Sequence, residues 1–212
     1  MAAKFVWILL SFIVINFTLN GQDSTFIKTK FNGDIGQYFG PKLTFPTALA
    51  FQGIVGFGEV EFRVNKQGKI DSINIITAPH VQMGQNIASL LLSTKDMWNP
   101  TLQNGQPIDY KYKLIVEYKI TKRSGPPPQG KAFALKDKAI KMNMKKKYVD
   151  ALELIDEAIS INPYQYEFYD LRSQILQSLG NTEGSILNRQ KSENLKKQIV
   201  AQIMVVKYGV VK

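Results

Sequence analysis

The chain has 212 residues, 44% of them hydrophobic and 21% charged, which is enough for one or two domains that each bury a core. It has no cysteine and a single histidine, His80, which excludes disulfides, thiolate metal sites and any site that needs two imidazoles. The net charge is +10, but the surplus of lysine and arginine is spread along the whole chain. Because a nucleic-acid groove needs a concentrated basic patch, no nucleic-acid partner is predicted.

Residues 1–21 have the pattern of an export signal. Lys4 precedes an apolar run of 15 residues that ends at Leu19, whereas a membrane span needs about 20. We expect a cleaved signal peptide, with a short inner-membrane anchor as the alternative; either one places the rest of the chain in the periplasm. Residues 22–43 hold few apolar residues and several glycines, and we interpret them as an extended lead-in.

Residues 44–121 predict a small domain with an antiparallel sheet and one covering helix. Phe45-Pro46 precedes a short helical segment that Gly53 closes. Alternating apolar residues then predict a hairpin, and a helical stripe that ends at Trp98 predicts a helix packed on the sheet, with Trp98 in the core. The expected elements are the strands 59–64 and 70–76, the helix 84–98 and the strand 109–120, in β-β-α-β order.

Three glycines, Gly53, Gly56 and Gly58, stand just before the first of these strands. A phosphate-binding loop must follow a strand, and the spacing of these glycines is not a dinucleotide fingerprint. We therefore interpret them as a flexible strand entry or a bulge.

The strand 109–120 follows a turn at Asn104-Gly105, two residues that suit a left-handed backbone. Its side chains alternate, so one face covers a core and the other meets water. Ile115 is the single apolar residue on the wet face; it is either a contact for a partner or an exposed isoleucine of no consequence. The core-facing residues are Tyr112, Leu114, Val116 and Tyr118, and the others are Lys111, Lys113, Glu117 and Lys119.

Residues 122–130 form a linker rich in proline and glycine, and beyond it the apolar period changes from 2 to 3.6. The region 131–212 is therefore predicted to be a separately folding all-α domain. A 34-residue self-similarity predicts two helix pairs with small residues where the helices approach. The recurring positions are Leu135, Ala139, Ala151 and Ala158, followed by Tyr169, Ser173, Ser185 and Ser192.

Two segments of this region have alternative interpretations. Lys145-Lys146-Lys147 is either a solvated helix end or a contact for an anionic partner such as a membrane surface or an acidic polymer. The segment 198–211 is rich in isoleucine, valine and methionine. We expect a capping helix there, with an exposed apolar patch as the alternative.

Residues 44–120 resemble the C-terminal domain of the TonB energy-transducer family. The residues that carry the resemblance are Phe45-Pro46, Gly53-Ile54, Gly56, Gly68, Trp98-Asn99-Pro100, Asn104-Gly105, Pro107, Tyr112 and Leu114. Residues 132–197 resemble tetratricopeptide repeats, with Leu135, Ala139, Tyr148, Ala151, Ile155, Ala158 and Pro163 in one good copy followed by a degenerate copy. The predicted fold class is thus α+β, a small TonB C-terminal-like domain followed by a tetratricopeptide-like domain.

The first resemblance implies a periplasmic protein of a Gram-negative bacterium that catches an extended segment of an outer-membrane receptor on its last strand, in support of TonB-dependent transport. The implied binding residues are Tyr112, Lys113, Leu114, Ile115, Val116 and Glu117, because an exposed sheet edge offers unpaired amides and carbonyls. The family also engages a proton-driven motor of the ExbB and ExbD type. The short N-terminus and the added helical domain favour an adapter over a full transducer.

No enzyme activity and no cofactor or metal are predicted, because the acidic pairs Asp156-Glu157 and Glu59/Glu61 lie on faces expected to be solvated. An alternative to the adapter is a scaffold that binds peptidoglycan or another envelope component through the helical surface. Binding driven by charge should weaken steeply with salt, whereas strand addition should weaken much less.

Overall fold

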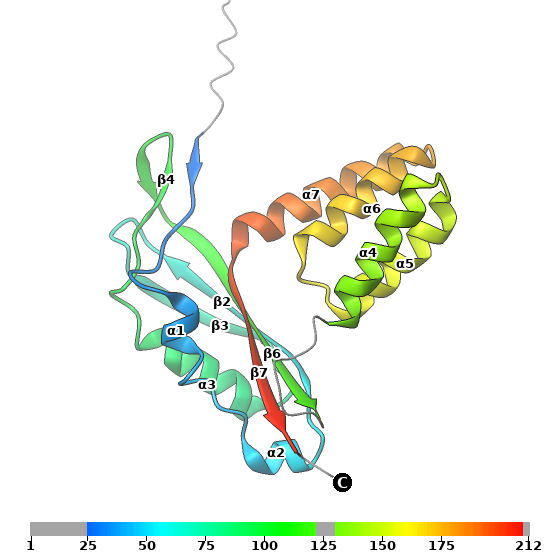
Figure 1. Cartoon of the computed structure of the whole chain (residues 1–212). Helices are drawn as coiled ribbons and strands as arrows, with labels where there is room; N and C mark the ends of the chain where they lie inside the picture. Colours follow the sequence, from blue (N-terminus) through cyan, green and yellow to red (C-terminus); the bar gives the residue numbers. More distant parts are fainter. Residues whose placement is uncertain (1–24, 122–129, 210–212) are drawn as a thin grey trace, which may run out of the picture.

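The structure is a computed structural model that describes residues 25–121 and 130–209, and it has a sheet part and a helical part (Figure 1). The helices within residues 130–198 lie on one side of the sheet. The helices within residues 35–92 lie on the other side of the sheet or at one end of it. The α+β class is therefore confirmed. The predicted signal peptide (1–21) and most of the predicted linker (122–130) lie outside the described residues.

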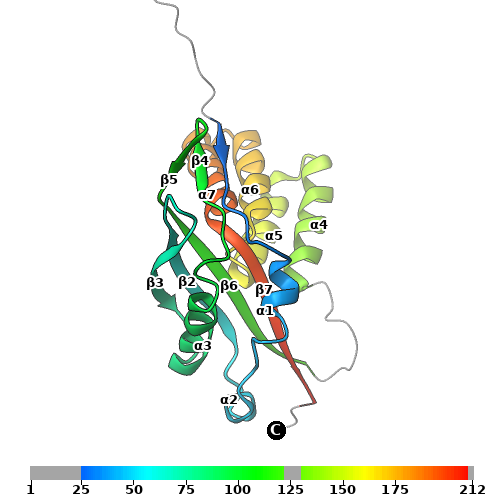
Figure 2. The ribbon, with the colours of Figure 1, turned by 90° about the vertical axis from the view of Figure 1, so that its left-hand side faces the viewer.

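A four-stranded sheet with the order β3-β2-β6-β7 is the centre of the molecule (Figure 2). β2 (Gly56–Val64) and β3 (Ile70–Thr77) form the expected hairpin, and β6 (Tyr110–Thr121) is antiparallel to β2. β7 (Ile199–Tyr208) pairs with β6 in parallel. Three strands are those expected from the alternation, and the fourth comes from the far end of the chain.

The inner face of the sheet holds the main core. α3 (Val81–Leu92) packs on it through Ile87 and Leu91, which are fully buried. Trp98 is 4% exposed, which confirms it as a core residue, and its Nε1 donates to Thr94 Oγ1 at 3.1 Å. The helix ends at Leu92 rather than at Trp98. The Thr94 hydroxyl donates back to the Leu91 carbonyl there, a bond that competes with continued helix.

Residues 25–43 are more than the extended lead-in that we expected. They form β1 (Phe26–Ile27) and α1 (Ile35–Phe39), whose N-cap Asp34 accepts the Gln37 N–H at 2.8 Å. Phe31 lies edge-on to Trp98, with ring centroids 5.1 Å apart. An extended lead-in does not describe this segment, because it contains a helix and because Phe31 and Phe39 are buried in the core.

The expected turns are present. α2 (Thr47–Phe51) is the short helix predicted before Gly53, and Gly56 opens β2 with φ of 132°, which confirms the strand-entry interpretation. β4 (Thr101–Gln103) and β5 (Gln106–Ile108) pair on either side of Asn104-Gly105, where φ is 52° and 76°. Both residues therefore have the left-handed backbone that this hairpin turn requires.

Four helices make up the helical part, α4 (Lys131–Met144), α5 (Tyr148–Ile161), α6 (Tyr166–Ser178) and α7 (Thr182–Gln198). They pack as two hairpins, and each recurring position of the 34-residue pattern is buried. Ser173 Oγ on α6 donates to the Ser185 carbonyl on α7 at 2.8 Å, so small residues do allow close approach. Membership of the tetratricopeptide class stays a prediction.

The segment after α7 is a strand, so the expectation of a capping helix is wrong. β7 follows Gln198 directly, and its residues belong to the sheet rather than to the domain 131–212 that we predicted. The physical reason is the high content of β-branched residues together with an available partner, the outer edge of β6.

Candidate partner-binding site

The residues predicted to bind a partner, 112–117, lie in the middle of β6. β2 pairs with β6 on one side, and β7 pairs on the other side from Lys113 to Thr121. The prediction that this strand is a sheet edge is therefore wrong. The backbone groups of β6 that point away from β2 already pair with β7 of the same chain. Whether these residues bind another protein stays a prediction.

The side chains of these six residues alternate between the two faces of the sheet. Tyr112, Leu114 and Val116 point to the inner core and are fully buried, as the alternation predicted. Lys113, Ile115 and Glu117 lie on the outer face. This outer face was expected to meet water, but the helical part lies on that side of the sheet (Figure 1), and two outer-face residues, Glu59 and Ile115, are buried.

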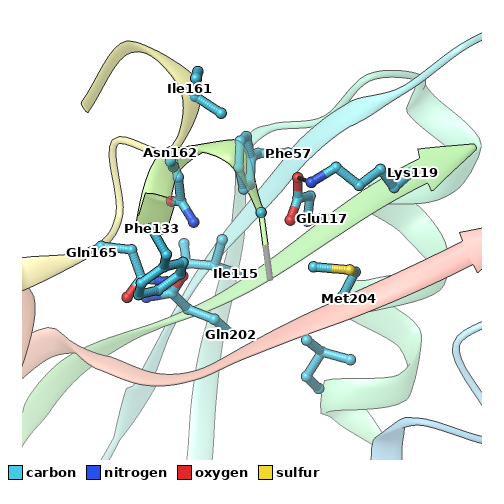
Figure 3. Close-up of a pocket in the computed structure, with 13 residues that line it drawn as sticks. Phe57, Ile115, Glu117, Lys119, Phe133, Ile161, Asn162, Gln165, Gln202 and Met204 are labelled. Carbon is cyan, nitrogen blue, oxygen red and sulfur yellow. Dashed lines mark hydrogen bonds and ion pairs between the residues drawn. The ribbon is translucent and has the colours of Figure 1, made fainter. Parts of the chain in front are cut away.

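Ile115 is buried under the helical part, with only 1% of its surface exposed. It lines a cavity of about 140 Å³ together with Phe133 of α4 and Gln202 of β7 (Figure 3). Neither interpretation of Ile115 as an exposed residue is therefore correct. The sequence did contain a signal, because an apolar residue on an otherwise polar strand face can be buried by another part of the same chain.

Charged side chains on the outer face pair with one another across β2 and β6. Lys113 Nζ lies 2.7 Å from Glu59 Oε1, and Lys111 Nζ lies 2.8 Å from Glu61 Oε1. In each pair the partners are diagonal in the sheet, because Glu61 stands directly opposite Lys113 and Arg63 stands directly opposite Lys111. Both lysines therefore neutralise acidic side chains of the neighbouring strand.

Tyr164, between α5 and α6, joins the helical part to β2. Its ring lies 5.2 Å from that of Phe57, and its hydroxyl donates to Glu59 Oε2 at 3.0 Å. Burial and the adjacent Glu59 carboxylate raise the pKa of Tyr164 above its usual value, so the phenol stays a donor in alkaline solution as well as at neutral pH. The Tyr164 carbonyl in turn accepts from Gln202 Nε2 at 3.0 Å, which ties β7 to the same contact.

Lys28 stands at the junction of α7 and β7. Its ammonium donates to the Lys196 carbonyl at 3.1 Å and also to the carbonyl of Ile199, the first residue of β7. Burial lowers the pKa of Lys28 to about 8, because removing the ammonium from water at the junction of α7 and β7 disfavours its charged form. The lead-in segment thus holds the start of the last strand.

The opposite edge of the sheet, β3, has no strand beside it among the described residues. Ile75 and Ile76 on this strand are 44% and 53% exposed. A shallow groove of about 310 Å³ separates β3 from α3 and includes Ser72 and Leu92. This second edge was not singled out from the sequence, although its β-branched residues and its single charge, Asp71, could have indicated it.

Metal ligands do not cluster at this site. In residues 25–121 and 130–209, no group of three or more His, Cys, Asp or Glu side chains is placed to hold a metal ion. His80 caps α3 instead, since its Nδ1 accepts the Gln82 N–H at 3.2 Å. What the outer face offers is therefore paired charges and a small apolar cavity.

Comparison with known families places the sheet part. Residues 41–120 match the family described as Gram-negative bacterial TonB protein C-terminal, which confirms the resemblance predicted from the sequence. The match supports a TonB-like role in protein interactions at the cell envelope for this segment. It extends from just before α2 to the end of β6, so β1, α1, the four helices of the helical part and β7 lie outside it.

Searches among curated proteins and among solved structures gave no match to the chain. Among the described residues, none of the helices has the length and hydropathy that crossing a bilayer requires.

Proposed function

We propose that the protein is an envelope adapter that captures an extended segment of an outer-membrane or other envelope protein by strand addition to its sheet, in support of TonB-dependent transport. The capture site is the outer edge of β6, with backbone contacts from residues 112–117. The domain that carries this edge matches the TonB C-terminal family over residues 41–120.

One observation supports this proposal above all: the outer edge of β6 accepts an extended strand in parallel. β7 occupies that edge along nine residue pairs, from Lys113↔Ile199 to Thr121↔Tyr208. A strand edge that pairs with a segment more than 80 residues away in the sequence has the geometry for a segment of another chain.

The strand seated on β6 also indicates what the captured segment must contain. Ala201, Ile203 and Val205 lie opposite Leu114, Val116 and Tyr118 and extend the inner apolar face. The intervening Gln202 and Met204 line the cavity under the helical part. A captured segment therefore needs small or β-branched apolar residues at every second position, with polar or flexible side chains between them.

The test uses extended peptides derived from outer-membrane receptors and measures their affinity for the full-length protein by fluorescence anisotropy. In an added strand, the amides of alternate residues point to the acceptor strand and the others point away. N-methylation of one parity removes several hydrogen bonds and should weaken binding by at least about thirtyfold. N-methylation of the other parity is the matched control and should leave affinity unchanged.

Equal effects of the two parities would contradict strand addition. A steep loss of affinity between low and physiological salt would instead favour the charge-driven envelope scaffold, because exposed charges are screened beyond about 8 Å at 0.15 M ionic strength. Binding of peptidoglycan fragments in place of receptor peptides would lead to the same conclusion.

A further inference from the structure

The structure places an extended segment of the chain itself on the edge where we propose capture. We infer that β7 is a built-in competitor for the partner: the captured segment of another protein binds β6 by replacing β7, in the same parallel direction and with an apolar residue at every second position. This inference rests on the proposed function and adds a condition for capture. The partner must displace a resident strand rather than find an open edge.

Burial differs sharply between β6 and β7. The inner-facing residues of β6 from Tyr112 to Tyr118 are at most 1% exposed. On β7 only Val205 is buried, at 8%, while Met204 and Tyr208 are 40% exposed. Because little apolar surface of β7 is fully removed from water, detaching it exposes far less core than detaching β6 would. Of the two strands, β7 is thus the one that can leave the sheet at the lower cost.

The backbone pairing of β7 is also of the weaker kind. Parallel ladders are slightly less stable per residue than antiparallel ones, and β7 forms the one parallel pairing between the described strands. Its register shifts between Lys113 and Leu114, so Val200 has no opposite residue. A partner segment without this irregularity would pair continuously along β6.

Polar contacts hold β7 at a few points near the surface. Lys28 binds the carbonyl at its first residue, Gln202 binds Tyr164 and Gln165, and Lys207 lies 3.4 Å from Thr47 Oγ1. These contacts orient the strand without burying it.

The connection between α7 and β7 makes the strand an intramolecular competitor. Ile199 directly follows Gln198, the last residue of α7, so β7 is delivered to β6 without an intervening loop. A tethered strand competes at a high effective concentration, and the apparent affinity of a free segment falls in proportion to the fraction of molecules whose edge is vacant. Variants that tighten or loosen β7 should therefore change capture in opposite directions.

The tightened variant is Glu117→Cys with Met204→Cys, two outer-face positions that stand opposite each other in the β6–β7 pair. The chain has no cysteine of its own, so a disulfide can form only there. Neighbouring strands are about 4.8 Å apart, within the Cα separation of about 4.4–6.8 Å that disulfides span. The same protein after reduction is the matched control.

The probe is a labelled peptide with the sequence of residues 199–208, added to full-length protein, with a scrambled peptide for comparison. We expect the reduced protein to bind it and the oxidised protein to bind at least about tenfold more weakly. Amide exchange should show that residues 199–208 of the protein lose protection when the peptide binds. Protection gained at residues 70–77 would instead place the peptide on β3 and overturn the inference.

The loosened variant is Val205→Thr, which places a hydroxyl at the one buried position of β7. We expect it to bind the peptide about three- to tenfold more tightly than the unaltered protein. Val206→Thr, at the adjacent position on the other face of the strand, is the control and should change affinity little. Equal affinity of the two variants would overturn the inference.

The remaining outcomes separate this inference from the proposed function. If receptor-derived peptides bind the oxidised and reduced proteins equally, with affinity that still depends on the N-methylated parity, strand capture takes place at an edge other than that of β6, and replacement of β7 is refuted. If the β7 peptide exchanges but receptor peptides bind neither form, replacement of β7 stands and the proposed partner is wrong. A concentration-dependent dimer of the Val205→Thr protein would show that a second copy, and not another protein, supplies the strand.

Discussion

The two faces of the sheet are held in different ways. The inner face is covered by aromatic and aliphatic side chains, including Phe62 and Trp98, whose ring centroids are 5.1 Å apart. The outer face carries ion pairs, of which Lys113–Glu59 is the least exposed, and one buried apolar residue, Ile115. Polar residues on a strand therefore do not identify a solvent-facing surface when each charge has a partner nearby.

The largest expected effect comes from ending the chain at residue 124, which removes the cover of the outer face altogether. The linker predicts that this fragment folds alone, whereas the place of β7 in the sheet predicts that it does not. Without β7 and the helices, the outer edge of β6 is unpaired and Ile115 is exposed. We expect aggregation, measured by size-exclusion chromatography. A monomeric fragment with strand-rich circular dichroism would show that the outer face needs no cover.

A smaller effect is expected on the inner face from Trp98→Ala. The indole is 4% exposed and contacts the rings of Phe31 and Phe62, so its loss leaves a large cavity. The free energy of unfolding should fall by about 3–5 kcal/mol, measured by urea denaturation. Trp98→Phe, which keeps an aromatic ring, should cost less. An unchanged melting temperature with loss of binding alone would make Trp98 a surface contact.

On the outer face, Ile115→Ala tests whether one apolar residue joins the two parts. We expect a loss of about 2–3 kcal/mol, at the low end for such a change because Ile115 already borders a cavity. Ile115→Val should cost about 1 kcal/mol. The measurement is again urea denaturation of the full chain. A cost below that of the valine variant would mean that the outer-face contact contributes nothing to stability.

The smallest effect concerns Tyr118 on the inner face, whose buried hydroxyl has no hydrogen-bond partner among the described residues. Tyr118→Phe should therefore stabilise the protein by about 1 kcal/mol at neutral pH. Burial raises the pKa of Tyr118 to about 12, so below pH 10 the phenol is uncharged in both states, and from pH 10 to 12 the stability of the protein falls because only the unfolded chain ionises there. The variant should lose less stability over that range in alkaline denaturation. A parallel decline in both proteins would assign the loss to other groups.

The sequence was sufficient for the elements whose signals are local. Alternation predicted β2, β3 and β6, and Asn104-Gly105 predicted its turn, because side-chain period and backbone φ depend on a few neighbouring residues. It was not sufficient for β7. A short apolar segment fits a strand or a helix, and only the available edge of β6, distant in the sequence, decides between them.

The same limit explains the errors at the candidate site. The burial of Ile115 and the interior position of β6 both depend on where the helical part returns to the sheet. No pattern within residues 109–120 contains that information. The inner face needed no such knowledge, since its apolar residues are buried whatever covers the other side.

The parallel pairing of β6 with β7 has a consequence for the order of folding. Lys113 and Ile199 are 86 positions apart, whereas the β2–β3 turn and the helix hairpins join near neighbours in the sequence. Long-range pairings form slowly because the intervening loop must close first. At about 5–20 residues per second, several seconds of synthesis also separate β6 from β7. We therefore expect a late refolding phase in which amides of β7 gain protection after those of β2 and α5, so the last strand to be made sets the rate at which the sheet is completed.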